Sequence, residues 1–147
     1  LDKVRRRALP AYPRSIAILT SVPSSALADM LRTAKECWPL TRLLIIPIPV
    51  QGSVAKDIQS VLIKLANCRS RLEIDAIVLA RGGGSREDLM VFDDEELCRD
   101  IANFPVPVVT GLGHEDDMTV ADLVADYRAS TPTATMVALL PNRESET

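Results

Sequence analysis

Four short apolar runs alternate along the chain with longer amphipathic segments. The runs cover residues 15–20, 43–48, 74–80 and 106–110, and aliphatic side chains dominate each of them. Near-continuous runs of this kind are typical of strands that are buried on both faces, as in a parallel sheet covered by helices. Pro47 indicates that the second strand lies at an edge of the sheet or ends there, and Pro107 lies near the start of the fourth.

The segments between these runs have the apolar spacing and the capping residues of helices. The last helix opens with Thr131 as its cap and Pro132 in its first turn. The predicted helices cover about residues 25–37, 54–67, 94–103 and 132–140, with the caps Ser24 or Ser25, Ser53, Asp93 and Thr131.

This alternation of strand and helix predicts an α/β fold. We expect a three-layer sandwich with right-handed crossovers and a mostly parallel sheet of four strands or slightly more, similar to the flavodoxin and Rossmann folds. A length of 147 residues suits one domain, so residues 1–147 are expected to form a single unit. The chain begins without Met and ends in a polar stretch, residues 141–147, and we expect it to be a fragment of a longer protein.

Composition limits the classes of function. The chain is 47% hydrophobic and 25% charged, which favours a globular domain over a disordered one. Its net charge of −3 gives the domain as a whole no basic nucleic-acid footprint. Aromatic residues make up only 3%, which argues against a platform that stacks single-stranded bases. Lys3 and residues 5–7 form a basic run, expected to be a solvated tail or a helix end.

Cysteine usage and hydropathy indicate the compartment. Cys37, Cys68 and Cys98 are widely spaced, and no pair has metal-ligand or redox spacing. We expect reduced, mostly buried thiols, as in a cytosolic protein. The sequence shows no signal peptide and no apolar run of about 18 residues, so no membrane association is expected and the predicted location is cytoplasmic.

A glycine-rich turn follows the third predicted strand. It reads Arg81, Gly82, Gly83, Gly84 and Ser85. The glycines allow backbone amides to approach an anion, and Arg81 can place two hydrogen bonds on a phosphate. Ser85 with residue 88 resembles a capping box, so a helix N-terminus would add to this preference. The alternative is a tight turn without a ligand. The spacing matches no nucleotide-binding motif, so no nucleotide cofactor is indicated.

A second polar turn follows the fourth strand and contains His114, the only histidine of the chain, followed by Glu115, Asp116 and Asp117. Nearby carboxylates favour the imidazolium, which can protonate a leaving oxygen. The same cluster could instead bind a divalent metal, or simply begin a helix.

Turns that follow parallel strands gather at one edge of the sheet, where ligands bind. We therefore expect the two turns to form one phosphate-handling site. Four further polar residues have an ordinary structural interpretation beside a functional one: Asp29, Asp122, Asp126 and Arg128.

Three strings in this order resemble the large subunit of exodeoxyribonuclease VII. They are RGGGS-x-EDL at 81–89, FDDE at 92–95 and GHE-x-D-x-T-x-x-D-x-x-AD-x-RA-x-TP at 113–132. The similarity extends over about residues 9–140 and departs from the family at residues 22–25, at Asp116 and at residues 136–137.

The resemblance implies a function. The family degrades single-stranded DNA from either end to short products. Its large subunit has an N-terminal OB-fold, a catalytic domain and a C-terminal helical region that gathers many small subunits. By this resemblance the chain is the catalytic domain without the other two regions, and its catalytic residues are Asp29, Arg81, His114 and Asp117. No metal cofactor is expected to be required, although magnesium is possible.

The resulting hypothesis gives each residue a role. Arg81 and the amides of the following turn bind the scissile phosphate, and His114 acts as general acid or base. Asp29 or Asp117 orients the histidine or a water. The two rivals are a metal-dependent phosphoesterase that uses residues 115–117, and a non-catalytic phosphate-binding or scaffold module.

Overall fold

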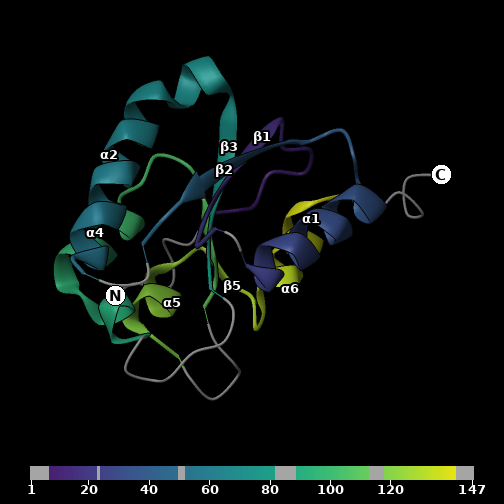
Figure 1. Cartoon of the computed structure of the whole chain (residues 1–147). Helices are drawn as coiled ribbons and strands as arrows, with labels where there is room; N and C mark the ends of the chain where they lie inside the picture. The colour runs from purple at the N-terminus through teal and green to yellow at the C-terminus, as the bar shows by residue number, and fades with distance from the viewer. Residues whose placement is uncertain (1–6, 23, 50–51, 82–88, 113–117, 142–147) are drawn as a thin grey trace.

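The computed structural model describes residues 7–22, 24–49, 52–81, 89–112 and 118–141. Within these residues all the strands are parallel and form one five-stranded sheet in the order β2-β1-β3-β4-β5 (Figure 1). The strands are β1 (Ser15–Thr20), β2 (Arg42–Pro47), β3 (Ile74–Ala80), β4 (Val108–Gly111) and β5 (Tyr127–Arg128).

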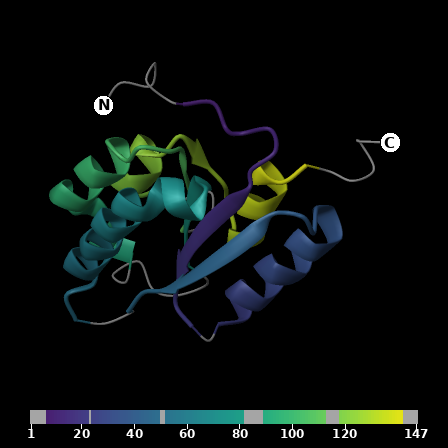
Figure 2. The same cartoon turned by 90° about the horizontal axis from the view of Figure 1, so that it is seen from above.

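Helices cover both faces of this sheet (Figures 1 and 2). The helices α1 (Ser25–Cys37) and α6 (Pro132–Leu139) pack against one face and against each other. The opposite face is covered by α2 (Val54–Leu72), α4 (Glu95–Ala102) and α5 (Val120–Val124), with the 3₁₀ helix η2 (Met90–Asp93) beside them. The predicted three-layer α/β sandwich with a parallel sheet is therefore confirmed.

The inner strand β1 shows why the sequence pattern predicted the strands correctly. All residues of β1 are buried. Ile16 and Ile18 belong to the core under α1 and α6, whereas Ala17 and Leu19 belong to the core under α2 and α4. A strand with apolar partners on both faces has no polar side to alternate with, which produces the continuous run seen in the sequence.

The edges of the sheet differ from the centre. The strand β2 lies at one edge, as its terminal Pro47 predicts. At the other edge β5 has only two residues, too short for a periodicity signal, and the sequence analysis missed it. The strand β4 begins at Val108 rather than at residue 106, directly after Pro107, which has no N–H to donate to a neighbouring strand.

Two helix boundaries correct the sequence-based expectations. The helix α2 continues to Leu72 instead of ending near Asn67, and it stops where Glu73 adopts a left-handed conformation with φ 57°. Ser53 precedes α2, but its side chain makes no capping hydrogen bond. The cap of α4 is Asp94 and not Asp93: the Asp94 carboxylate accepts from the backbone N–H of Leu97 at 2.9 Å. The predicted caps of α1 and α6, Ser24 and Thr131, are confirmed.

The basic N-terminal run is not wholly a solvated tail. The Arg7 guanidinium donates to both carboxylate oxygens of Asp126, at 3.1 and 2.9 Å, and to the carbonyl of Phe104. The Asp126 side chain is only 4% exposed, so this is a partly buried ion pair that holds the entering chain against the start of β4. The other basic residues of the run lie outside the described residues.

The expectation of mostly buried thiols is only partly right. All three cysteines are free, but Cys37 and Cys68 are half-buried, and only Cys98 is buried. Burial raises the pKa of the Cys98 thiol to about 11, and its S–H donates to the carbonyl of Phe92. No helix in the described part of the chain is long and apolar enough to cross a membrane.

Ion pairs fix the edge of the sheet at which the strands begin. Arg14, just before β1, donates to both oxygens of Asp75 at 3.1 and 2.9 Å and to Glu73 at 3.0 Å. Arg42 at the start of β2 reaches Glu73 at 3.3 Å. The side-chain hydrogen bond from Arg14 lowers the pKa of Asp75 below its usual value. The starts of β1, β2 and β3 are thereby joined to one another.

This arrangement predicts an acid-sensitive contribution to stability. Because the pKa of Asp75 is lowered in the folded state, its bond to Arg14 stabilises the fold above the unfolded pKa of about 3.9. That contribution is lost as the pH falls through the lower, folded value. Asp75→Asn should reduce the free energy of unfolding at pH 7, and the difference from the unsubstituted chain should shrink below about pH 4. Urea unfolding at both pH values measures this, with Glu36→Gln, at an exposed carboxylate in α1, as the control. A difference that does not change with pH would contradict the assignment.

Candidate functional site

The order of the strands creates a topological switch point, beside β1, at the edge of the sheet where the strands end. From β1 the chain crosses to β2 on one side, whereas β3 lies on the other side of β1. In open α/β sheets, ligands bind at such a switch point, outside the carboxyl ends of the strands. Leu19 is paired with Leu79 in the register, so the chain leaves β1 and β3 at adjacent positions. The turns after these two strands open at this point.

Arg81 lies directly at this edge. It follows the last residue of β3, is half-buried, and its backbone N–H donates to the carbonyl of Gly111, at the end of β4, at 3.0 Å. The glycine-rich turn and the histidine turn therefore leave the sheet from hydrogen-bonded neighbours. Gly82, Gly83, Gly84 and Ser85 lie outside the described residues.

Asp29 is in the second turn of α1, the helix that begins at the same edge. Its side chain is 49% exposed and forms an ion pair with Arg32, one turn further along the helix. Exposed pairs of this kind contribute little stability, typically about 0–1 kcal/mol. The Asp29 carboxylate can therefore leave Arg32 for another partner at little cost.

His114 and Asp117, with Glu115 and Asp116, lie outside the described residues. Leu112, just before this segment, is 2% exposed, whereas Met118, just after it, is 52% exposed, and the next residue, Thr119, is again buried at 5%. Among the residues that the structure describes, no group of three or more His, Cys, Asp or Glu side chains could hold a metal ion. The acidic cluster at 115–117 is not among those residues.

A second hydrogen bond joins the two turns where they re-enter the fold. Asp93, in η2, accepts from the backbone N–H of Val120, the first residue of α5, at 2.8 Å. The residues on either side of the two turns are thus hydrogen-bonded to each other. Arg81 binds Gly111 on the N-terminal side of the turns, and Val120 binds Asp93 on the C-terminal side. Sequence reasoning took Asp93 for the cap of the following helix and missed this role.

Comparison with known proteins identifies the family of this chain. The model of the family described as "Exonuclease VII, large subunit" matches residues 1–147. The chain belongs to this family. The resemblance drawn from the sequence motifs is therefore confirmed.

Several curated relatives carry the name Exodeoxyribonuclease 7 large subunit. The protein of Parasynechococcus marenigrum (strain WH8102) is 75% identical over 143 residues, which is 97% of this chain and 37% of the relative. That of Synechococcus sp. (strain CC9311) is 70% identical over 145 residues, 99% of this chain and 37% of the relative. That of Legionella pneumophila (strain Paris) is 48% identical over 138 residues, 94% of this chain and 31% of the relative. The chain therefore spans about a third of the length of these relatives.

Two aspartates of the exonuclease VII motif at 113–132 serve opposite edges of the sheet. Asp126 lies at the edge where strands begin: it accepts from the N–H of Val108 at 2.8 Å and pairs with Arg7. Asp122 lies near the edge where strands end and accepts from the Thr110 hydroxyl of β4 at 2.6 Å. The structural interpretation of Asp126 is therefore correct, whereas Asp122 belongs to the surroundings of the candidate site.

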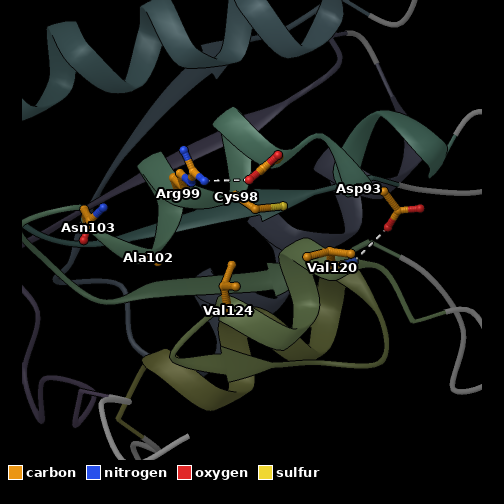
Figure 3. A pocket seen from close by; sticks show the side chains of 8 residues that line it. Asp93, Cys98, Arg99, Ala102, Asn103, Val120 and Val124 are labelled. Atoms are coloured by element: carbon orange, nitrogen blue, oxygen red, sulfur yellow. Dashed lines mark hydrogen bonds and ion pairs between the residues drawn. The ribbon is translucent and has the colours of Figure 1, made fainter. Parts of the chain in front are cut away.

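A shallow cavity of ≈ 350 Å³ opens between α4 and α5 (Figure 3). Both apolar residues, including the two valines of α5, and polar residues line it. None of the predicted site residues within the described ranges lines it. The lining residues are Asp93, Glu95, Cys98, Arg99, Ala102, Asn103, Val120 and Val124. Asp93 and Val120, whose hydrogen bond joins η2 to α5, are among the residues that line this cavity.

The close approach of α6 requires a glycine at the end of β4. A Cβ at Gly111 would lie 2.6 Å from Cγ2 of Thr135, 2.9 Å from the Thr131 carbonyl oxygen and 3.1 Å from Cα of Pro132. The first turn of α6 therefore packs directly on the strand end whose carbonyl binds Arg81.

Gly111→Ala should destabilise the fold by about 1–3 kcal/mol, because the added methyl group overpacks this contact. The double variant Gly111→Ala, Thr135→Ser should recover only part of the loss, since the serine removes Cγ2 but leaves the two backbone contacts. Denaturant unfolding of the three proteins measures this. A single variant as stable as the unsubstituted chain would show that α6 does not press on Gly111.

Proposed function

We propose that this chain is the catalytic domain of an exodeoxyribonuclease that hydrolyses phosphodiester bonds in single-stranded DNA from its ends. One observation supports the proposal: the backbone N–H of Arg81 donates to the carbonyl of Gly111, so the residues that directly precede the glycine-rich turn and the histidine turn are hydrogen-bonded neighbours at the edge where the strands end. Membership of the exonuclease VII large subunit family and the names of the relatives support it.

In the proposed site, a few groups bind the phosphate and transfer the protons. Arg81, with the backbone amides of residues 82–85, binds the scissile phosphate and stabilises the charge that builds on its oxygens. Hydrolysis breaks the bond from phosphorus to the leaving oxygen, which gains a proton, while the attacking water loses one. His114 transfers one of these protons, and Asp29 or Asp117 orients the histidine or the water.

We also propose that no divalent metal is required. The guanidinium of Arg81 and an imidazolium at His114 bring the positive charge that a metal would otherwise bring to the phosphate. Adjacent carboxylates such as those at 115–117 are typical ligands of hard cations, so a metal-dependent phosphoesterase is the chemical rival, and a chelator separates the two.

Other parts of the protein hold the strand in this proposal. The net charge of −3 and the scarcity of aromatic residues leave this domain without the cationic groove and stacking surfaces that give affinity for single strands. The relatives are more than twice as long as the matched segment. We therefore assign strand holding to an N-terminal OB-fold and recruitment of small subunits to a C-terminal helical region, both outside these residues, in a cytoplasmic enzyme.

The full-length protein, assembled with its small subunit, should degrade end-labelled single-stranded DNA in the presence of excess EDTA. His114→Ala should lower the rate by about 10²–10⁴, the usual cost of losing a general acid or base, with an unchanged melting temperature. Product analysis on a gel with and without chelator measures both effects. Complete inhibition by EDTA that magnesium reverses would favour the metal-dependent rival, and binding without cleavage would favour the scaffold module.

Arg81→Lys should impair cleavage nearly as much as Arg81→Ala. Lysine keeps the charge but loses the planar pair of donors that grips two phosphate oxygens. The backbone bond from residue 81 to Gly111 is available to both variants, so the sheet edge is preserved. The control is Arg99→Lys, an exposed arginine of α4 paired with Glu95, which should leave the rate unchanged. If Arg81→Lys retains most of the activity, Arg81 contributes only charge and not a two-point grip.

A further inference from the structure

Asp122 is a charged side chain that the fold buries almost completely, at 1% exposure. A buried carboxylate is costly unless hydrogen bonds and an opposite charge satisfy it. Here Oδ1 accepts from the Thr110 hydroxyl at 2.6 Å, and Oδ2 accepts from the N–H and hydroxyl of Thr119 at 2.9 and 3.1 Å. Nε of Arg128 lies 3.7 Å from Oδ2. Both oxygens are therefore used within the protein.

The two threonines flank the segment that carries the histidine. Thr110 is the residue before the end of β4, and Thr119 is the cap of α5. His114 and Asp117 lie between them in the sequence. One carboxylate thus holds the point at which this segment leaves the sheet and the point at which it re-enters the fold.

This arrangement exceeds what a helix cap needs. The reciprocal capping box of α5 uses Thr119 and Oδ2 of Asp122. The bond from Thr110 to Oδ1 adds a connection to the sheet, and it fixes where the N-terminus of α5 lies along β4. With five residues, α5 is too short to be stable without tertiary contacts, so such a connection decides its position.

Arg128 supplies the opposite charge from the neighbouring strand. It lies in β5, directly opposite Thr110 in the register, and the N–H of Ala129 donates to the Thr110 carbonyl at 2.7 Å. The short fifth strand therefore brings an arginine against the carboxylate that the fourth strand binds. This gives the motif residues Asp122 and Arg128 a joint role that spacing alone does not indicate.

We propose that Asp122 is a positioning residue for the reaction, which fixes both flanks of the segment containing His114 and Asp117 through Thr110 and Thr119. The inference rests on the proposed nuclease function. Because the rate of a proton transfer depends steeply on alignment, a displacement of about 1 Å at the flanks is enough to lower turnover on the order of 10²-fold. Arg81 is held by a different bond, to Gly111, so binding of the substrate phosphate is independent of Asp122.

Thr110→Val in the full-length large subunit, assembled with small subunits, isolates this bond, since valine keeps the shape and removes the hydroxyl. We expect kcat on single-stranded DNA to fall about tenfold to 10²-fold with KM nearly unchanged, and Thr110→Ser to restore most of it. The matched control is Thr41→Val. Thr41 is also buried and donates to the carbonyl of Pro13 at 2.8 Å, but at the edge where strands begin. The Thr41→Val protein should be less stable than the wild-type protein but should have the same kcat.

Each outcome bears on the proposal when rates are measured well below the melting temperature of every variant. A Thr110→Val protein with wild-type kcat, or with a loss no larger than that of Thr41→Val, overturns it. Asp122→Asn is a second variant: its side chain has one acceptor oxygen instead of two, so it cannot accept from both Thr110 and Thr119, and it should lower kcat at least as much. Wild-type protein that fails to cleave single-stranded DNA would instead overturn the proposed function itself.

Discussion

The arrangement of this domain depends on the parallel pairing of β1 with β3 at the centre of the sheet. Both strands are buried on both faces, so their register is set by two cores at once. A slip by one residue would exchange the side chains of these two cores. The pairing therefore fixes which residues of β1 and β3 lie next to each other where the two strands end. Arg81 is the first residue after β3, so its position follows from this register.

The two edges of the sheet differ in how their charged side chains are paired. At the edge where strands begin, Arg14, Arg42 and Arg7 are all engaged with carboxylates of the fold, and the lowered pKa of Asp75 reflects one of these bonds. At the opposite edge the Asp29 carboxylate is half exposed and forms an ion pair with Arg32 of the same helix. The described part of this second edge therefore combines an exposed carboxylate on α1 with the buried Asp122, and the exposed one is free to exchange partners with a ligand at such an edge.

The sequence was sufficient for the layers and the central strands because β1 and β3 bury both faces and Ser24 and Thr131 have ordinary cap chemistry. The sequence was insufficient where tertiary contacts determine the local structure or the partner of a side chain. The two-residue β5 exists because β4 lies beside it, and Asp93 binds Val120 of α5 rather than its own helix. Asp122 and Asp126 have the same side chain and opposite locations, which only the fold distinguishes. Of the four predicted catalytic residues, Asp29 and Arg81 are described, and both lie toward the expected edge.

The geometry also explains why a domain with a net negative charge can be proposed to act on DNA. Affinity for a strand grows with the number of phosphates that are neutralised, whereas cleavage requires charge stabilisation at a single phosphate. In the proposed function, Arg81, which directly follows β3 and is hydrogen-bonded through its backbone to β4, serves the second task and not the first. If strand holding resides elsewhere in the protein, this domain can keep the carboxylates that orient a histidine or a water, because their repulsion of the DNA is offset by the rest of the assembly. The acidic balance of the chain is then consistent with a catalytic unit that depends on its neighbours for substrate.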